Sequence, residues 1–179
     1  DLVDYARKKG SLSYGTWGNG SSAHLFGELL AQQSGTRLVH AAYKSEAAAH
    51  NDLFGELLDF AWANPSTARA QTQGGKMKVL GVAGTRRVST MPQIATFSEQ
   101  GFKGFDLDSW IGMYAPANLP GDLQNTWVTA LRDITAMPDV QAKLISFGFE
   151  PLGNTPQQFM EVFKADFPRV SELIKAAGV

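Results

Sequence analysis

Residues 14–25 read Tyr-Gly-Thr-Trp-Gly-Asn-Gly-Ser-Ser-Ala-His-Leu, and the expected fold is built outward from them. A short alternating run at 12–14 precedes them, and apolar residues at helical spacing follow over 25–30. The segment is therefore predicted to be a turn that leads from a strand into a helix. Such a turn directs free backbone N–H groups and the positive end of the helix dipole outward, which favours a small anion.

The residues of this turn suit anion binding. Gly18 and Gly20 permit positive φ angles and close approach of a ligand to the backbone. Ser21 or Ser22 can cap the helix or donate a hydroxyl group. A capped helix whose glycines serve only the turn is the alternative interpretation. The spacing matches neither the Walker A motif, because no Gly-Lys-Ser/Thr follows, nor the dinucleotide-binding fingerprint.

Composition limits the classes of function. The chain has 179 residues, enough for one domain or two small lobes. Its 16 basic and 17 acidic residues give a formal net charge of −1 without a basic stripe, so nucleic acid is not an expected partner. No apolar run is long enough to span a bilayer, so direct membrane insertion is not expected. Cysteine is absent, which excludes disulfides and thiolate metal sites.

The histidines and the first residues of the chain lead to two further expectations. None of the 3 histidines is paired at a metal-ligand spacing, so neither a metal nor a cofactor is predicted. The chain begins at Asp1 with residues that already read as helix, which indicates a fragment or a trimmed chain. The lack of a signal peptide therefore says nothing about the compartment.

Strands alternate with helices through the first half of the chain. A short helix ends at Gly10, and three more are predicted at 21–34, at 46–54 and from Asn64-Pro65 to Gly74. Strands are predicted at 12–15, 37–43, 57–61 and 77–83, the last being the clearest and of buried character. This order implies an α/β fold with a mostly parallel sheet that helices cover on both faces.

The pattern changes after Gly84. A polar loop is followed by one helical turn at 96–101 and a long extended stretch at 105–115. Three helices are predicted after it, the last opened by a capping box at Thr155-Pro156-Gln157-Gln158. Pro168 is expected to kink or break this last helix. Apolar faces run along the helices, formed by Leu123, Trp127, Leu131 and Ile134 and by Phe159, Val162 and Phe163.

Several side chains suggest chemistry. Trp17 and Trp62 are predicted pocket walls, because ligands of parallel α/β sheets lie beyond the carboxyl ends of the strands. His24 falls in the first helical turn and could reach a bound anion.

A small serine hydrolase using Ser22 is an alternative function, disfavoured because a nucleophile elbow needs glycine where His24 stands. An effector-binding sensory domain of the same architecture is another. Asp106 and Asp108 are more typical of the solvated side of an edge strand than of acid–base catalysis.

The chain as a whole resembles a known family. The matching segments are 14–25, the Ala-Tyr-Lys-Ser run at 42–45, Gly-Gly-Lys-Met-Lys-Val-Leu-Gly-Val at 74–82, and further segments at 85–87, 91–92, 97–102, 109–117 and 153–156. As an ordered set, they resemble the Bug/TctC solute-binding receptors of tripartite tricarboxylate transporters. The resemblance covers essentially the whole chain.

The resemblance implies a periplasmic, non-enzymatic receptor with a type II periplasmic-binding-protein (Venus flytrap) fold, whose two lobes close on a small carboxylate. The chain lacks the family's N-terminal segment. Residues 1–105 then correspond to the second lobe with the glycine loop, and 106–179 to a crossover strand and C-terminal helices that belong to lobe one. The implied partners are a carboxylate ligand and the transporter's membrane subunits. An isolated fragment is expected to expose apolar helix faces and could dimerise.

Ligand contacts are carried over from the family by position. The resulting ligand-binding set is Thr16, Trp17, Gly18, Asn19, Gly20, Ser21, Ser22, His24, Trp62 and Ala63. Some positions depart from the family: Ala42 replaces a proline, Ser45 replaces a glycine, and Pro168 is unusual at its position. Ala63 also lacks the acidic group that many members have there, which argues against ligands with an ammonium group. A dicarboxylate or an aromatic carboxylate is the expected ligand.

Overall fold

A parallel sheet forms the centre of the N-terminal half. The computed structural model describes residues 1–108 and 110–178, and within them three strands pair in the order β2-β1-β3. The central strand β1 spans Leu12–Thr16, β2 spans Leu38–Ala42 and β3 spans Phe60–Ala61. Tyr14 lies opposite His40 on one side and Phe60 on the other. The predicted α/β class with a parallel sheet is confirmed.

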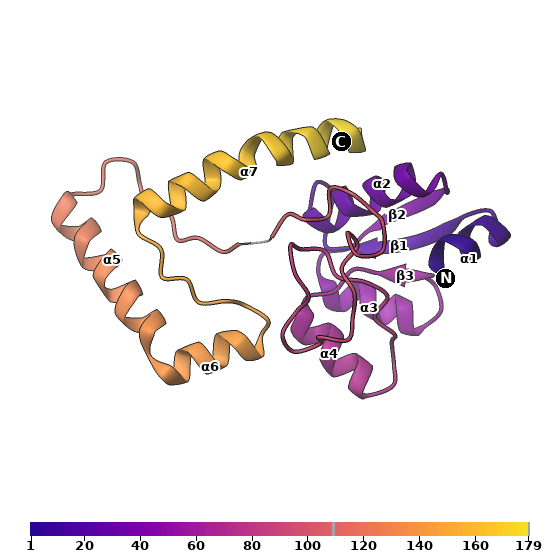
Figure 1. The fold of residues 1–179 in the computed structure, drawn as a ribbon, viewed down its shortest axis with the longest axis horizontal. Coiled ribbons are helices and arrows are strands. Elements are labelled where there is room, and N and C mark those ends of the chain that lie inside the picture. The colour runs from indigo at the N-terminus through magenta and orange to yellow at the C-terminus, as the bar shows by residue number, and fades with distance from the viewer. Residues whose placement is uncertain (109, 179) are drawn as a thin grey trace.

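Helices cover both faces of this sheet (Figure 1). Helix α2 packs on one face, where Gly27 lies directly over the Tyr14 ring. Helix α3 packs on the other, where Ala49 faces Gly15. The bounds of the helices in this half are α1 Leu2–Lys9, α2 Ser22–Ser34, α3 Glu46–Phe54 and α4 Pro65–Gln73, all close to the predicted ranges.

The core sits between α2 and the segment that follows the sheet. Phe26, Leu29 and Leu30 of α2 surround Phe105, which is completely buried. The Phe105 ring stacks on Phe97 with centroids 4.3 Å apart. Residues from 97 to 105 are therefore held against α2 by aromatic packing rather than by strand pairing.

The predicted buried strand at 77–83 is wrong. This segment forms no ladder in the described structure apart from one bridge between Val82 and Thr96. The edge strand β3 is only two residues long, and just before it the Ser13 N–H donates to the Asp59 carboxylate at 2.8 Å. Most of the segment is half-buried rather than buried, and Leu80 retains 48% of its accessible surface.

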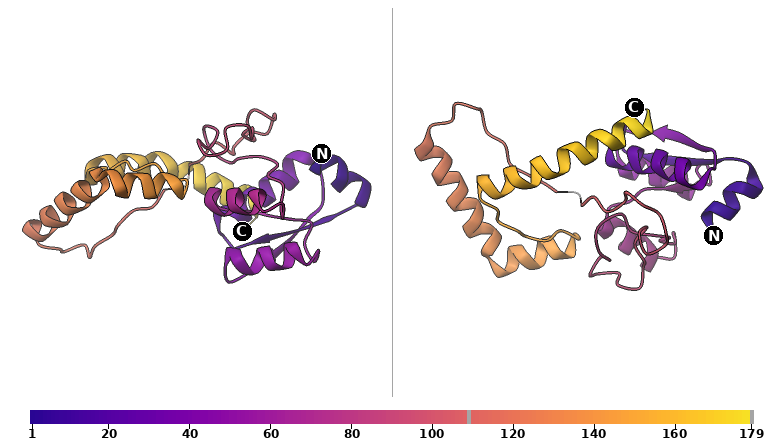
Figure 2. Two further views of the ribbon diagram at one scale, coloured as in Figure 1. Left: turned by 90° about the horizontal axis from the view of Figure 1, so that it is seen from below. Right: turned by 45° about the horizontal axis from the view of Figure 1, so that its top comes forward.

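The C-terminal half is a helical arm. It comprises α5 Gly121–Ala136, α6 Pro138–Ser146 and α7 Pro156–Ala177. Figures 1 and 2 show α5 and α6 standing apart from the sheet, while the end of α7 returns to lie against α2. The predicted capping box at Thr155 is present.

Pro168 does not break α7. The prediction was a kink or a break; the helix is continuous across this proline, so the break is wrong, and the kink stays a prediction. A proline removes only one backbone donor from a helix. Contacts on both sides of Pro168 stabilise α7 despite this loss. The capping box fixes the start, and the Arg169 Nη2 donates to the Asp106 carboxylate at 2.9 Å beyond the proline.

Residues 105–108 and 110–115 are irregular rather than part of an edge strand. Asp106 pairs with Arg169, and Asp108 accepts hydrogen bonds from the N–H and hydroxyl of Thr85. The interpretation of the two aspartates as the solvated side of an edge strand is therefore wrong. Ser109, which falls in this stretch, lies outside the described residues.

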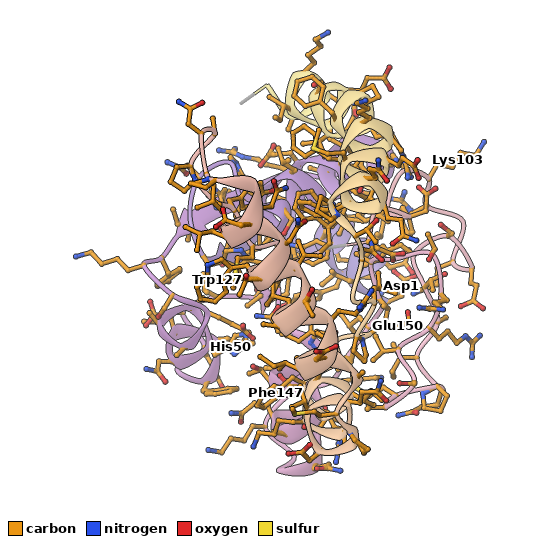
Figure 3. All side chains as sticks on the ribbon, turned by 90° about the vertical axis from the view of Figure 1, so that its left-hand side faces the viewer. Asp1, His50, Lys103, Trp127, Phe147 and Glu150 are labelled. Carbon is orange, nitrogen blue, oxygen red and sulfur yellow. The ribbon has the colours of Figure 1, made fainter. Side chains whose placement is uncertain are left out.

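The apolar faces of the arm are exposed, as expected from the sequence. Trp127 on α5 retains 56% of its accessible surface, and Leu123 retains 47%. Phe147, directly after α6, and Phe163 on α7 are also exposed. Figure 3 looks at the arm from its far end and labels Trp127 on α5. These faces find little cover within the chain itself.

Candidate functional site

The glycine loop connects β1 to α2. It runs from Trp17 to Ser21, with Gly18 at φ 128° and Gly20 at φ 71°. Within the described part of the chain, a Cβ atom at either glycine would meet nothing within 4 Å. The glycines are thus required by backbone conformation and not by lack of space. Ser21 caps α2, because its Oγ accepts from the His24 N–H at 3.3 Å.

Three amides of this loop are already used inside it. The Gly18 N–H donates to Thr16 Oγ1 at 3.3 Å, and the Ser21 N–H donates to the Gly18 carbonyl at 3.3 Å. The Gly20 N–H donates to Nδ1 of His24 at 3.1 Å. These bonds fix the shape of the loop, and they leave fewer donors for a ligand than the sequence suggested.

Three other amides at this helix end have no acceptor among residues 1–108 and 110–178. They are the N–H groups of Asn19, Ser22 and Ala23. The Ser22 hydroxyl likewise has no hydrogen-bond partner in the described structure. The first N–H groups of a helix lack intrahelical acceptors and carry the positive end of its dipole. An anion placed here would satisfy them.

The structure divides the predicted site residues into three groups. Trp17, Ser22, Trp62 and Ala63 line one open cleft of about 2520 Å³ between the sheet and the arm. Gly18, Asn19, Gly20 and Ser21 form the loop beside it. Thr16 and His24 lie behind the loop, with Thr16 completely buried and His24 only 9% exposed. The two buried residues shape the loop from within.

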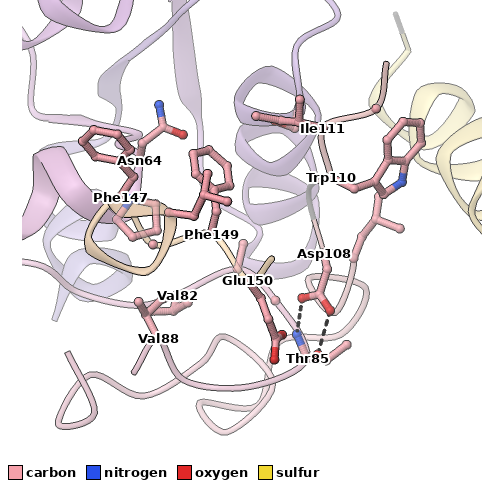
Figure 4. A pocket seen from close by; sticks show the side chains of 18 of the residues that line it. Asn64, Val82, Thr85, Val88, Asp108, Trp110, Ile111, Phe147, Phe149 and Glu150 are labelled. Carbon is pink, nitrogen blue, oxygen red and sulfur yellow. Dashed lines mark hydrogen bonds between the residues drawn. The ribbon is translucent and has the colours of Figure 1, made fainter. Parts of the chain in front are cut away.

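The far side of this cleft is formed by the segment that leads into the arm. Figure 4 shows Asp108 directed at Thr85, with Phe147, Phe149 and Glu150 of the arm nearby. Glu150 forms an ion pair with Arg86 of the loop after the sheet. The cleft is several times larger than a typical small-ligand pocket of roughly 300–1,000 Å³. A small ligand would therefore occupy only the part next to the glycine loop.

His40, Tyr14 and Glu28 belong to the site, although sequence reasoning did not select them. The His40 ring stacks on His24 with centroids 3.8 Å apart, and His40 Nε2 lies 2.6 Å from Thr16 Oγ1. The Tyr14 hydroxyl donates to Glu28 Oε1 at 2.7 Å. Burial, followed by the hydrogen bond to Glu28, raises the pKa of Tyr14. The alternation of the strand could have predicted that residues 14 and 16 lie on one face of the sheet. The pairing of this strand with residue 40 could not be predicted from the sequence.

The geometry does not support nucleophilic or metal chemistry. In the described structure, no histidine contacts the Ser22 hydroxyl, and His24 Nδ1 is occupied by the Gly20 N–H. A serine nucleophile needs an adjacent base within hydrogen-bond distance. Among the described residues, no group of three or more His, Asp or Glu side chains is placed to hold a metal ion.

Trp62 carries an unsatisfied buried donor. Its Nε1 is buried and has no hydrogen-bond partner within 1–108 and 110–178, while its ring packs on Phe26 and Phe97 at 5.7 and 5.6 Å. An unsatisfied buried polar group costs about 1–3 kcal/mol. Trp62→Phe removes that cost but also some packing, so we expect the unfolding free energy to stay within about 1 kcal/mol of the parent.

Urea denaturation measures this effect, with Trp62→Ala as the control. The alanine variant loses the packing as well and is expected to cost about 3–5 kcal/mol. A phenylalanine variant as unstable as the alanine variant would show that Nε1 is bonded in solution.

Comparison with known proteins agrees with this geometry. The sequence profile of the tripartite tricarboxylate transporter family receptor, TctC, matches residues 1–179. The chain belongs to this family. Members of the TctC family are periplasmic solute-binding proteins and not enzymes. The resemblance predicted from the sequence is confirmed.

Relatives of the TctC family match almost all of this chain, but the chain matches only part of them. A UPF0065 protein encoded in the TAR-I ttuE-ttuC' intergenic region of Agrobacterium vitis is 29% identical over 182 residues, covering 99% of this chain and 53% of that protein. A UPF0065 protein of Bordetella pertussis is 28% identical over 180 residues, covering 100% of this chain and 56% of that protein. The chain thus spans about half the length of the curated relatives it matches.

Solved structures agree with the fold. The periplasmic binding protein BugD is 33% identical with a TM-score of 0.86, covering 99% of this chain and 60% of that one. R. palustris Rpa4515, whose structure was determined with adipate, is 26% identical with a TM-score of 0.87 and the same coverage. These likenesses confirm a periplasmic-binding-protein fold for the TctC chain. In its described residues, no helix is both long enough and apolar enough to cross a bilayer.

Proposed function

We propose that this chain is the carboxylate-binding part of an extracytoplasmic solute-binding protein that serves a tripartite tricarboxylate-type secondary transporter. The observation that carries the proposal is the set of amides of Asn19, Ser22 and Ala23, which lack acceptors within the described structure. They lie at the start of the 13-residue helix α2, where the helix dipole adds to their attraction for a negative charge. A ligand carboxylate supplies the missing acceptors.

The walls of the cleft favour a dicarboxylate or an aromatic carboxylate. Trp17 and Trp62 line it next to Ser22 and offer flat apolar surface to the ligand body. Ala63 brings no charge to this wall, so a ligand ammonium group would find no partner there. The adipate in the Rpa4515 structure is a dicarboxylate, which agrees with this ligand class.

The division into lobes remains a proposal. Residues 1–105 are assigned to the second lobe, and 106–179 to the crossover and to helices that pack on lobe one. Support comes from the exposed apolar faces of α5 and α7 and from the relatives, which are longer than this chain. Pairing of two copies through the same faces would produce a dimer instead.

Ligand binding is proposed to shift an equilibrium between open and closed arrangements of the lobes. The membrane subunits of the transporter would recognise the closed form. A ligand can shift such an equilibrium only by its difference in affinity for the two forms. Contacts from both sides of the cleft would supply that difference.

The proposal is tested by titrating the 15N-labelled chain with adipate and recording backbone amide shifts. We expect the largest shifts at Asn19, Ser22 and Ala23, because hydrogen bonds to a carboxylate deshield the N–H groups that donate them. Adipamide, which has the same length without charge, serves as the control and is expected to leave these amides unchanged. Equal shifts with both compounds, or shifts confined to other residues, would contradict the proposal.

A further inference from the structure

Two stacked histidines lie behind the glycine loop. His24 of α2 and His40 of β2 have ring centroids 3.8 Å apart and planes inclined by 15°. Nδ1 of His24 accepts the Gly20 N–H at 3.1 Å. A ring nitrogen that accepts a hydrogen bond carries no proton, so His24 is neutral in this arrangement, with its proton on Nε2. We call His24 and His40 the histidine pair.

The second member of the histidine pair supports the other glycine. His40 Nε2 lies 2.6 Å from Thr16 Oγ1, and this hydroxyl oxygen accepts the Gly18 N–H at 3.3 Å. One histidine thus holds Gly20 directly, and the other holds Gly18 through Thr16. Both glycines have positive φ, and these two attachments hold the loop together with the bonds from the Ser21 N–H and hydroxyl to the Gly18 carbonyl.

The surroundings of His40 disfavour a proton on it. Burial, and then His24, lower the pKa of His40, while Glu28 acts in the opposite direction. Glu28 Oε1 lies 3.8 Å from His24 Nε2, but it already accepts the Tyr14 hydroxyl at 2.7 Å. The Tyr14 ring lies 5.2 Å from His40 and is a further titratable neighbour.

Protonation of His24 would remove its attachment to the loop. A proton on Nδ1 of His24 places two N–H groups against each other and breaks the bond to Gly20. Since the unfolded chain protonates its histidines near pH 6.5, whereas the folded chain resists a proton on His40, the fold loses stability as the pH falls below about 6.5. The loop can avoid this contact between two N–H groups by moving Gly20 away from His24.

We infer that the histidine pair consists of positioning residues that make carboxylate binding dependent on pH. In the neutral state, the pair holds Gly18 and Gly20 in the conformation that leaves the Asn19, Ser22 and Ala23 amides free. Protonation releases the loop and lowers affinity for the ligand. The affinity part rests on the proposed function, whereas the loop part does not.

The loop part is tested without any ligand, by following backbone amide shifts between about pH 5 and 8, the range in which histidine titrates. We expect the Gly20 amide to move as the pH falls through this range, because its N–H loses its acceptor on His24. His24→Asn is the matched variant, because its side-chain oxygen replaces Nδ1 as an acceptor and does not titrate. The Gly20 shift should then become independent of pH. A wild-type Gly20 amide that fails to titrate would overturn the inference, whether or not the variant folds.

The affinity part is tested by adipate titrations at about pH 5.5 and 8. We expect wild-type affinity to fall about tenfold at the lower pH, because only the fraction with an intact loop binds. The affinity of the His24→Asn variant should fall only by the amount that protonation of adipate itself causes. Equal losses in the two proteins would overturn the coupling. Absence of adipate binding at both values would refute the proposed function, and the Gly20 titration would still decide the role of the pair.

Discussion

Ser22→Asp is expected to abolish carboxylate binding without unfolding the protein. Ser22 is the first residue of α2, its N–H lacks an acceptor in the described structure, and its side chain lines the cleft. The first turn of α2 contains no acidic residue, so an aspartate here interacts favourably with the helix dipole, by about 0.3–1 kcal/mol. The same carboxylate occupies the anion position and repels an incoming ligand.

Repulsion decides the size of this effect. Two like charges about 4 Å apart near a protein surface interact by about 4 kcal/mol, and each 1.4 kcal/mol is about a factor of ten in affinity. We therefore expect at least a hundredfold loss of affinity for adipate. The measurement is the amide-shift titration described above, together with urea denaturation to show that stability is kept or slightly raised.

Ser22→Asn is the matched control, since it has the same shape as aspartate without the charge. It is expected to retain binding within a few fold. Equal weakening by asparagine and aspartate would point to a steric effect. Undiminished binding to the aspartate variant would place the carboxylate elsewhere in the cleft.

Local sequence signals were sufficient to predict most of the α/β unit. Gly35 ends α2 in the left-handed conformation, and Ser21 and Thr155 cap their helices. Each of these effects depends on a few adjacent residues. The prediction of a strand at 77–83 failed because a strand needs a pairing partner elsewhere in the chain, and in the described structure this segment has one bridge, between Val82 and Thr96. The sequence of the segment itself did not contain that information.

The candidate site was predictable in position but not in detail. Glycines and hydroxyls before an apolar helix indicated the loop and its free donors. Which amides remain free was not predictable, because the Gly20 N–H is taken by a side chain four residues later. His40 entered the site only through the parallel register of β1 and β2. Such register cannot be read from either strand alone.

Gly27→Ala is expected to destabilise the fold strongly, although alanine is the better helix former. Gly27 lies in the middle of α2, over Tyr14 of β1, and a Cβ there would come within 2.5 Å of the Tyr14 hydroxyl oxygen and closer still to the ring. Tyr14 is completely buried and stacks on Phe60 at 5.3 Å, so its ring has no space to move into. Alanine gains about 1 kcal/mol of helix propensity, whereas overpacking costs about 1–3 kcal/mol or more.

The clash should dominate, because backbone and a stacked ring must shift together to relieve it. We expect a net loss of about 2 kcal/mol in urea denaturation, a large part of the roughly 5–15 kcal/mol that stabilises a typical domain. Gly121→Ala is the control. In the described structure, a Cβ at Gly121, which begins α5, meets no atom within 4 Å, so this variant should be neutral or slightly stabilised.

A double variant separates the clash from a general intolerance of α2. Tyr14→Leu removes the ring that the new Cβ would meet, so Gly27→Ala should cost less in that background than alone. Residues in direct contact typically show coupling energies of about 0.5–3 kcal/mol. Strict additivity of the two substitutions would mean that α2 does not lie on β1 at Gly27. That outcome would also remove the explanation for the position of residues 17–21, because α2 is the helix that positions Ser22 and His24 next to this loop.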